Sequence, residues 1–257
     1  MTDWHVHTTN CDGKSEAEET VLSAIDRGVK ILGFSGHGYT AHDGSYCMSL
    51  ESTEKYIAEI TRLREKYKDK IEIRLGVEQD FLSEDSPWAE YRIGSVHYMD
   101  FEGEYIDVDG GNDQLLYAAE KYCGGDMISV CEKYFDIVAK VYEKTKCDII
   151  GHFDLITKYN ERERIIDTEN PRYIAAWKKA VDALIGANVP FEINLGAIFR
   201  GMRTTPYPSG EQIRYIASRG GKFILTSDSH SADTVALDFP KWKEWAEALG
   251  AEILEKI

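Results

Sequence analysis

The sequence has little of what marks several large classes of protein. No apolar run approaches the roughly 18 residues that a membrane-spanning helix needs. Basic residues are in the minority, with 30 Lys and Arg against 45 Asp and Glu, and the formal net charge is -15. Such a surface repels phosphate backbones and anionic lipids. We therefore expect neither a nucleic-acid partner nor a membrane partner, and an anionic substrate would need positive charge within its own site.

Cysteine is also scarce, with five residues in the chain and no CxxC pair. An odd number of cysteines without such pairs is typical of reduced thiols in the cytosol. The first motif begins at residue 4, so we expect no targeting segment ahead of the fold. These features predict a cytoplasmic protein and leave its oligomeric state open.

Internal repeats, low-complexity tracts and linker-like segments are absent too, so we expect one domain over residues 1–257. Near-continuous apolar runs alternate with amphipathic stretches, as strands and helices do around a parallel sheet. Seven strand–helix units of this kind predict an α/β fold with a closed or nearly closed sheet. The predicted strands lie in DWHVH, ILGFSGH, IEIRLGVEQD, RIGSVHYM, DIIGHFD, PFEINL and KFILTSD.

Helices are predicted between these strands, except that residues 87–92 are expected to form either a short helix or a turn. The last helix is expected to end at the C-terminus. One segment, residues 100–126, breaks the alternation and is rich in Gly, Asp and Tyr. We interpret it as an excursion over the rim of the sheet and a candidate substrate lid. The other predicted helices cover residues 15–28, 50–67, 127–146, 171–186 and 211–219.

Six of the seven histidines stand at or just past the end of an apolar run. His5 and His7 form an HxH pair, and a strand of period 2 turns both rings to one side. Imidazole and carboxylate groups are the ligands of zinc, iron and manganese, and parallel barrels gather their strand ends at one rim. The candidate metal ligands are His5, His7, Asp12, His37, Glu78, His97, His152, Asp228 and His230.

Several of these residues also have simpler interpretations. Glu78 could bridge two cations, or it could form a buried ion pair with an arginine. Asp12 and Asp228 both suit turns, which would still place their carboxylates at the rim. His230 could be solvated at its strand end. His42 lies in a loop with no strand before it, so it is either a solvated histidine or a contact to substrate.

Four arginines follow the fifth and sixth predicted strands. Arg162 and Arg164 come after DIIGHFD, and Arg200 and Arg203 come after PFEINL. Guanidinium groups bind phosphate through two parallel hydrogen bonds, so arginines near a metal cluster suggest a phosphate clamp. The alternative is ordinary solvated charge. We expect at least one of the four to contact the substrate, with Arg200 as the first choice.

The motifs HVH, SGH, GVE, SVH, GHFD and SDSH, in this order along the whole chain, resemble the polymerase-and-histidinol-phosphatase (PHP) superfamily. The longer stretches IGSVHY, IIGHFDLITKY and EINLGAIFRG, followed by PYPS, are similar to its histidinol-phosphatase branch. The resemblance implies a distorted (β/α)7 barrel of TIM-like form, with a metal cluster at the C-terminal ends of the strands. It also implies three divalent transition metal ions, drawn from Zn, Fe and Mn.

The resemblance further implies how the ligands are shared among the ions. Glu78 would bridge the first and second ions. Some family members have histidine where this chain has Asp12, which is therefore the ligand that departs most from the pattern. The implied sets are His5, His7, Glu78 and Asp228 for the first ion, Glu78, His97 and His152 for the second, and Asp12, His37 and His230 for the third.

The implied activity is that of a metal-dependent phosphomonoesterase, L-histidinol-phosphate phosphatase, which acts in histidine biosynthesis. Its substrate would be a small phosphorylated molecule, L-histidinol phosphate. Arg200, Asp228 and His230 would be the catalytic groups. The candidates to receive the positive charge of the substrate are Asp100, Asp107 and Asp109.

Two other functions stay open. The protein could be a PHP phosphoesterase that acts on another small phosphate ester or a nucleotide, which a panel of phosphate esters would reveal. It could also be a non-catalytic interaction module stabilised by metals. A structural metal site is closed and keeps no position for water, whereas a catalytic site is open.

Overall fold

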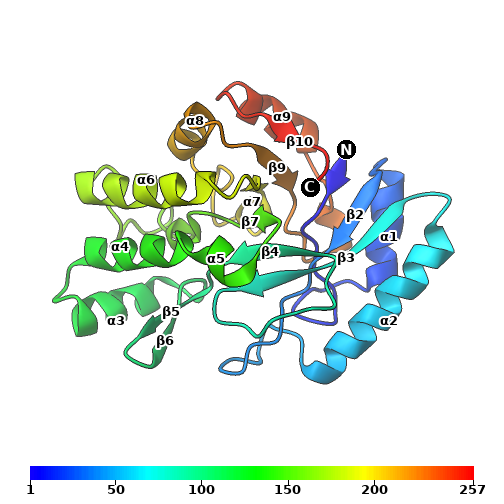
Figure 1. The fold of residues 1–257 in the computed structure, drawn as a ribbon, viewed down its shortest axis with the longest axis horizontal. Coiled ribbons are helices and arrows are strands. Elements are labelled where there is room, and N and C mark those ends of the chain that lie inside the picture. The colour runs from blue at the N-terminus through cyan, green and yellow to red at the C-terminus, as the bar shows by residue number, and fades with distance from the viewer.

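The structure, a computed structural model, describes residues 1–257. Its main feature is a parallel sheet of eight strands in the order β1-β2-β3-β4-β7-β8-β9-β10 (Figure 1). A separate antiparallel hairpin is formed by β5 and β6. The strands are β1 (Thr2–Asp3), β2 (Ile31–Phe34), β3 (Glu72–Asp80), β4 (Tyr91–Ser95), β5 (Tyr98–Phe101), β6 (Glu104–Asp107), β7 (Ile149–Ile150), β8 (Phe191–Asn194), β9 (Phe223–Thr226) and β10 (Ile253–Leu254).

The sheet curls until its first strand meets its seventh. Just beyond β1 and β9, Val6 forms a parallel bridge with Ser229. The His7 amide donates to the Ser229 carbonyl at 2.8 Å, and the Ser229 amide donates to the His5 carbonyl at 3.2 Å. We call this junction the seam. It confirms the predicted distorted TIM-like barrel of parallel strands.

Helices cover the outside of the sheet. Figure 1 shows α1 and α2 along one flank, beside β2 and β3, with α3, α4 and α6 layered on the opposite flank. None of the helices has both the length and the apolar character to cross a bilayer. The helices are α1 (Ala17–Asp26), α2 (Leu50–Tyr67), α3 (Asn112–Tyr122), α4 (Met127–Val138), α5 (Val141–Thr145), α6 (Pro171–Ile185), α7 (Gly196–Phe199), α8 (Gly210–Ser218) and α9 (Phe239–Glu247), with short 3-10 turns η1 (Leu155–Thr157) and η2 (Ala232–Thr234).

The long helices follow from local signals. α2 begins after Ser49, whose hydroxyl accepts the Ser52 amide at 3.0 Å and so satisfies one of the free donors of the first turn. Tyr56, Ile60 and Leu63 recur at helical spacing and are fully buried against the sheet. α6 begins with proline at its first turn, as the sequence predicted.

The structure corrects two expectations. The last helix does not reach the C-terminus, because α9 ends at Glu247 and the chain adds β10 beside β9. The helix predicted over 127–146 is divided into α4 and α5. Between β3 and β4, residues 87 and 88 form a turn, which is one of the two forms expected there. The excursion predicted over residues 100–126 contains most of the β5–β6 hairpin and α3.

The apolar core has two parts. A large cluster of 56 buried residues lies mostly between the sheet and its helices. A smaller cluster of six belongs to the inside of the barrel, where the Tyr91 hydroxyl donates to the Trp4 carbonyl at 2.7 Å. A Cβ at Gly33 or Gly76 would come within 2.3 Å of the Tyr91 side chain, so these glycines make room for it. The six are Trp4, Ile31, Tyr91, Ile93, Ile149 and Ile224.

Candidate metal centre

All nine predicted ligands meet at the carboxyl ends of the barrel strands. Eight of them form three groups, and within each group the candidate ligand atoms lie within 4.8 Å of one another. The ninth, His152, lies beside these groups, with its Nε2 2.8 Å from Glu78 Oε1. His7 belongs to two groups and His37 to two, so the groups adjoin. The groups are His7, Asp12, His37 and His230; His5, His7 and Asp228; and His37, Glu78 and His97.

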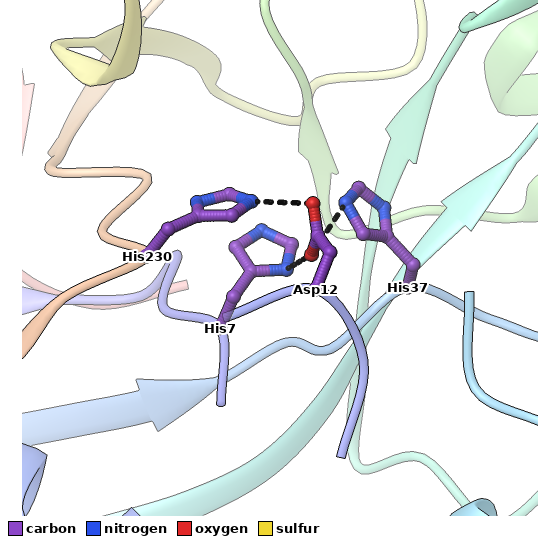
Figure 2. Close-up of side chains that lie close together, drawn as sticks. All are labelled: His7, Asp12, His37 and His230. Carbon is purple, nitrogen blue, oxygen red and sulfur yellow. Dashed lines mark hydrogen bonds and ion pairs between the residues drawn. The ribbon is translucent and has the colours of Figure 1, made fainter. Parts of the chain in front are cut away.

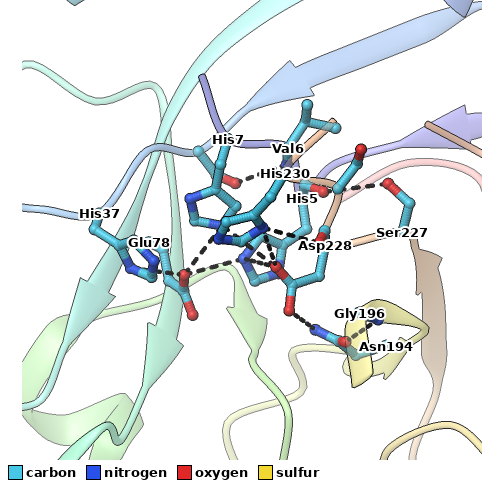
Figure 3. Close-up of polar contacts among 12 residues, drawn as sticks. His5, Val6, His7, His37, Glu78, Asn194, Gly196, Ser227, Asp228 and His230 are labelled. Atoms are coloured by element: carbon cyan, nitrogen blue, oxygen red, sulfur yellow. Dashed lines mark hydrogen bonds and ion pairs between the residues drawn. The ribbon is translucent and has the colours of Figure 1, made fainter. Parts of the chain in front are cut away.

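Glu78 contacts candidate ligands from four other parts of the barrel, and only 1% of it is exposed. Figure 3 shows Glu78 beside His37 and linked to other members of the cluster. Its Oε2 lies 3.1 Å from His5 Nε2 and 3.0 Å from His37 Nδ1. Its Oε1 lies 2.8 Å from His152 Nε2 and 3.4 Å from His97 Nε2. Burial would raise the pKa of this carboxyl, but His5, His37 and His97 outweigh that effect and hold it well below its usual range.

The group of His7, Asp12, His37 and His230 surrounds Asp12 at the opening of the site (Figure 2). One Asp12 oxygen, Oδ2, lies 3.1 Å from His230 Nε2, and the other lies 3.6 Å from His37 Nε2 and 3.8 Å from His7 Nδ1. The side chain of Asp12 is 33% exposed, the most of the nine. Burial, together with the charges of His7 and Arg200, lowers the pKa of His230 to about 4, which leaves its ring neutral near pH 7.

Asp228 follows β9 and has a left-handed backbone with φ of 47°. Its Oδ1 lies 3.4 Å from His7 Nε2 and 3.8 Å from His5 Nε2. Arg200 reaches the same oxygen at 3.3 Å. Burial would raise the pKa of Asp228, but Arg200 and His5 hold it well below its usual range. Asp228 is therefore ionised, which suits a metal ligand better than a proton donor.

The donor set fits divalent metal ions by a structural criterion. The Nε2 atoms of His5 and His7 are buried and have no hydrogen-bond partner. Both nitrogens face the carboxylates of Glu78 and Asp228. Buried polar atoms are almost always satisfied, so unpaired nitrogens and carboxylate oxygens that converge on one point are a donor set suited to a cation.

The sequence reasoning overlooked residues that hold these ligands in place. Glu192 on β8 is fully buried and accepts from His5 Nδ1 at 2.5 Å. Asp80 accepts from the backbone amide of His97 at 2.6 Å and lies 3.2 Å from its Nδ1. A usable signal existed for Glu192, because a carboxylate inside the apolar run PFEINL must have buried partners.

A cavity of about 600 Å³ opens above the ligands. Arg200 and Lys158 supply positive charge to its wall, and Lys158 pairs with Asp109 at 2.5 Å. Asp107 also lines the cavity. Asp100 does not, because its carboxylate accepts the Gly103 amide in the turn of the β5–β6 hairpin.

The other three arginines do not line this cavity. Arg203 is buried and donates to Asp154 at 3.2 Å. Arg162 donates to the carbonyl of Gly201 at 2.8 Å, next to Arg200. Each of these contacts shapes the surrounding loops rather than the cavity itself.

Arg164 and His42 lie outside the cavity as well. Arg164 is exposed and forms a surface pair with Asp167 at 3.4 Å. The ring of His42 stacks on Tyr105, with centroids 4.2 Å apart, and meets Tyr98 edge-on. His42 therefore packs on the outer side of the cavity wall that Tyr98 lines.

A family model for the PHP domain matches residues 3–195. The chain belongs to the PHP domain family. The matched span contains seven of the nine candidate ligands, and Asp228 and His230 lie beyond it.

This PHP-domain protein is similar over most of its length to known proteins. One, from Deinococcus radiodurans and described as a probable histidinol-phosphatase, is 28% identical over 93% of this chain and 90% of its own. A crystal structure from Listeria monocytogenes matches with a TM-score of 0.80 at 19% identity, covering 94% of this chain and 100% of its own. The crystal structure of histidinol phosphate phosphatase from Lactococcus lactis, complexed with zinc, L-histidinol and phosphate, matches with a TM-score of 0.74 at 22% identity, covering 98% and 95%. At these identities the two structures support the fold.

Proposed function

We propose that the protein is a metal-dependent phosphomonoesterase that hydrolyses L-histidinol phosphate to L-histidinol and phosphate. The observation that carries the proposal is an open cavity with converging imidazole and carboxylate groups at its base and Arg200 in its wall. An open site of this kind suits catalysis, whereas a structural metal site would be closed. The Lactococcus relative, which was crystallised with L-histidinol and phosphate, supports the choice of substrate.

The three groups of ligands would hold three divalent transition metal ions, as the family resemblance implies. Glu78 would bridge two of them, because its two oxygens face different histidines. When bound, such ions supply positive charge to the phosphate oxygens and lower the pKa of water. His230 is suited to ligation because its low pKa leaves a lone pair on a neutral ring.

Arg200 would bind the phosphate group. Burial would lower the pKa of its guanidinium, but Asp228, Asp109 and Asp12 raise it, so the group keeps its charge. Its side chain is 32% exposed and reaches both Asp228 and His230. It can therefore turn toward an anion in the cavity while it stays beside the candidate ligands, and its positive charge would stabilise the transition state of phosphoryl transfer.

Acidic and aromatic side chains of the cavity lining would receive the positively charged end of the substrate. Asp43, Asp107 and Asp109 line the cavity together with Tyr46 and Tyr98. The Tyr98 hydroxyl donates to Asp43, and the rings of Tyr46 and Tyr98 are stacked 6.0 Å apart. Carboxylates with aromatic faces attract ammonium and imidazolium groups, so this part of the lining would suit the cationic end of the substrate.

The test compares turnover of L-histidinol phosphate with that of a panel of phosphate esters and nucleotides. Protein stripped by a chelator should be inactive, and Zn, Mn, Fe or Co should restore activity. Full turnover without metal would refute the metal-dependent mechanism. A faster reaction with another ester would support phosphoesterase activity but would refute histidinol phosphate as the substrate.

A further inference from the structure

Strand β8 supplies none of the nine candidate ligands, yet it touches ligands from three other parts of the barrel. Its alternate side chains Glu192 and Asn194 point into the barrel, and both are fully buried. Between them they contact His5 beyond β1, His152 beyond β7 and Asp228 beyond β9. One strand therefore reaches ligands from both neighbouring strands and from across the seam.

Glu192 is surrounded by hydrogen-bond donors. Its Oε1 accepts from His5 Nδ1 at 2.5 Å and from the Thr226 hydroxyl at 2.6 Å. Its Oε2 accepts from the His152 backbone amide at 2.7 Å and from Asn194 Nδ2 at 3.0 Å. A proton fixed on His5 Nδ1 leaves the lone pair of Nε2 free to face the cluster, the arrangement that a ligating histidine needs.

Asn194 fixes the orientation of Asp228 (Figure 3). Its Nδ2 donates to Asp228 Oδ2 at 3.1 Å, and its Oδ1 accepts the Gly196 amide at 2.8 Å. Asp228 Oδ1 is thereby left to face His5 and His7. A Cβ at Gly196 would lie 2.4 Å from Asp228 Oδ2, so the glycine also preserves this orientation.

We propose that Glu192 and Asn194 are positioning residues that act chiefly on the ion held by His5, His7 and Asp228. They hydrogen-bond the side chains of His5 and Asp228 but only the backbone amide of His152. Neither residue hydrogen-bonds Asp12, His37 or His230. The group around Asp12 is linked to β8 only indirectly, through the shared ligand His7 and through Asp228, whose Oδ1 lies 3.5 Å from His230 Nδ1. The inference rests on the metal binding of the proposed function and assigns a division of labour within it. β8 would order the inner ion directly, and the outer group at the opening would depend on β8 much less.

The decisive variant is Glu192→Gln, which keeps the shape of the side chain. Since all four neighbours of Glu192 are donors, the amide nitrogen must face at least one donor and lose that contact. The zinc content of purified protein, measured by plasma mass spectrometry, should fall by about one ion per chain. Zinc titration of stripped protein should show one class of site weakened by roughly 10-fold to 100-fold.

Anomalous scattering from zinc-loaded crystals of Glu192→Gln should show reduced density between His5, His7 and Asp228 and full density beside Asp12. Glu192→Asp, which keeps the charge, should recover part of the lost affinity. The matched control is Gln212→Ala, which removes another buried polar side chain, on α8, that caps its helix through Ser209. This control should lower the melting temperature and keep the full zinc content.

The outcomes separate the two proposals. A wild-type protein that binds none of Zn, Mn, Fe and Co would refute the proposed function itself. Wild-type protein that binds zinc while Glu192→Gln binds the same amount with the same affinity would refute the positioning role alone. Equal loss of zinc from both groups in Glu192→Gln would refute the division of labour.

Discussion

Two layers of side chains fill the inside of the barrel. Both are buried, but one layer is apolar and the other consists of ionisable groups. The lower layer is the apolar cluster that includes Ile31 and Ile93. The upper layer contains His5 and Glu78, with exposed fractions of 0% and 1%. They meet on β4, where Ile93 belongs to the lower layer and the Ser95 hydroxyl donates to Glu78 at 2.7 Å.

The two layers contribute differently to the free energy of folding. Burial of the lower layer stabilises the fold at about 25 cal/mol for each Å² of apolar surface. Burial of Glu78 costs solvation free energy, and it is chiefly the imidazoles around it that offset that cost. Residues retained at such a cost indicate a binding role, and the predictions below test whether the layers can be disturbed separately.

The largest effect should come from Glu78→Gln in the upper layer. The change removes the charge that would be shared by two ions, so metal content and activity should fall together. We expect kcat/KM to decrease by more than the roughly 100-fold that changes around ligands produce. Metal analysis and steady-state kinetics measure both. Normal metal content with near-normal activity would show that Glu78 serves only as an ion-pair partner.

Ile31→Ala in the lower layer should reduce stability while metal content and activity remain. The free energy of unfolding should fall by about 2–5 kcal/mol, because the change leaves a cavity among packed side chains. Urea denaturation measures this loss, and Ile31→Val should cost only about 0.5–1.5 kcal/mol. Folded Ile31→Ala protein should keep its metals and its kcat. A loss of metal from protein that remains folded would mean that the layers are coupled.

Arg200→Ala should lower activity without disturbing either layer. Loss of the guanidinium should reduce kcat/KM by roughly 100-fold, or about 2.7 kcal/mol of transition-state stabilisation, while metals and fold remain. Arg200→Lys should recover only part, because an ammonium cannot form two parallel bonds. Arg74→Ala, which removes a surface arginine paired with Glu72, is the control. Unchanged kinetics in Arg200→Ala would place phosphate binding elsewhere, with Lys158 as the next residue to test.

The smallest effect should come from a surface pair outside both layers. Hydrogen bonds from Arg172 lower the pKa of Asp126 to about 2. A lowered pKa in the folded state stabilises the protein above the unfolded value near 4, and that contribution disappears as pH falls toward 2. Arg172→Ala should therefore lower the melting temperature slightly at pH 7 and not at pH 2. A difference that persists at pH 2 would show that Arg172 acts through packing.

Much of the upper layer could be predicted from the sequence because its signals are local. His37 and Glu78 stand where apolar runs meet polar residues, and parallel strands bring such ends together. Their assignment to individual ions stays a prediction. Local signals fail at β1, which has two residues. There the positions of His5 and His7 depend on the pairing of Val6 with Ser229 at the far end of the chain.

Other features were hidden because they depend on partners distant in sequence. In the sequence, Glu192 appears only as a polar interruption of an apolar strand. Its role depends on His5 and His152, which donate hydrogen bonds to it from distant parts of the chain. The end of α9 was a missed local signal, since Gly250 has a positive φ of 95° and glycine commonly stops helices. β10 could not be predicted, because its pairing with β9 is a tertiary contact.

The seam joins two parts of the chain that are far apart in sequence. Across it, the Ser227 amide donates to Asp3, a residue 224 positions away. An ion bound by His5, His7 and Asp228 would fasten the two sides of the seam, and so would act as a cross-link that closes a very long loop. Cross-links remove entropy from the unfolded chain, and closing even a 100-residue loop contributes about 4.7 kcal/mol. Binding of this ion would therefore reinforce the backbone hydrogen bonds that already close the ring, and its removal would leave those hydrogen bonds alone to hold the first and seventh strands together.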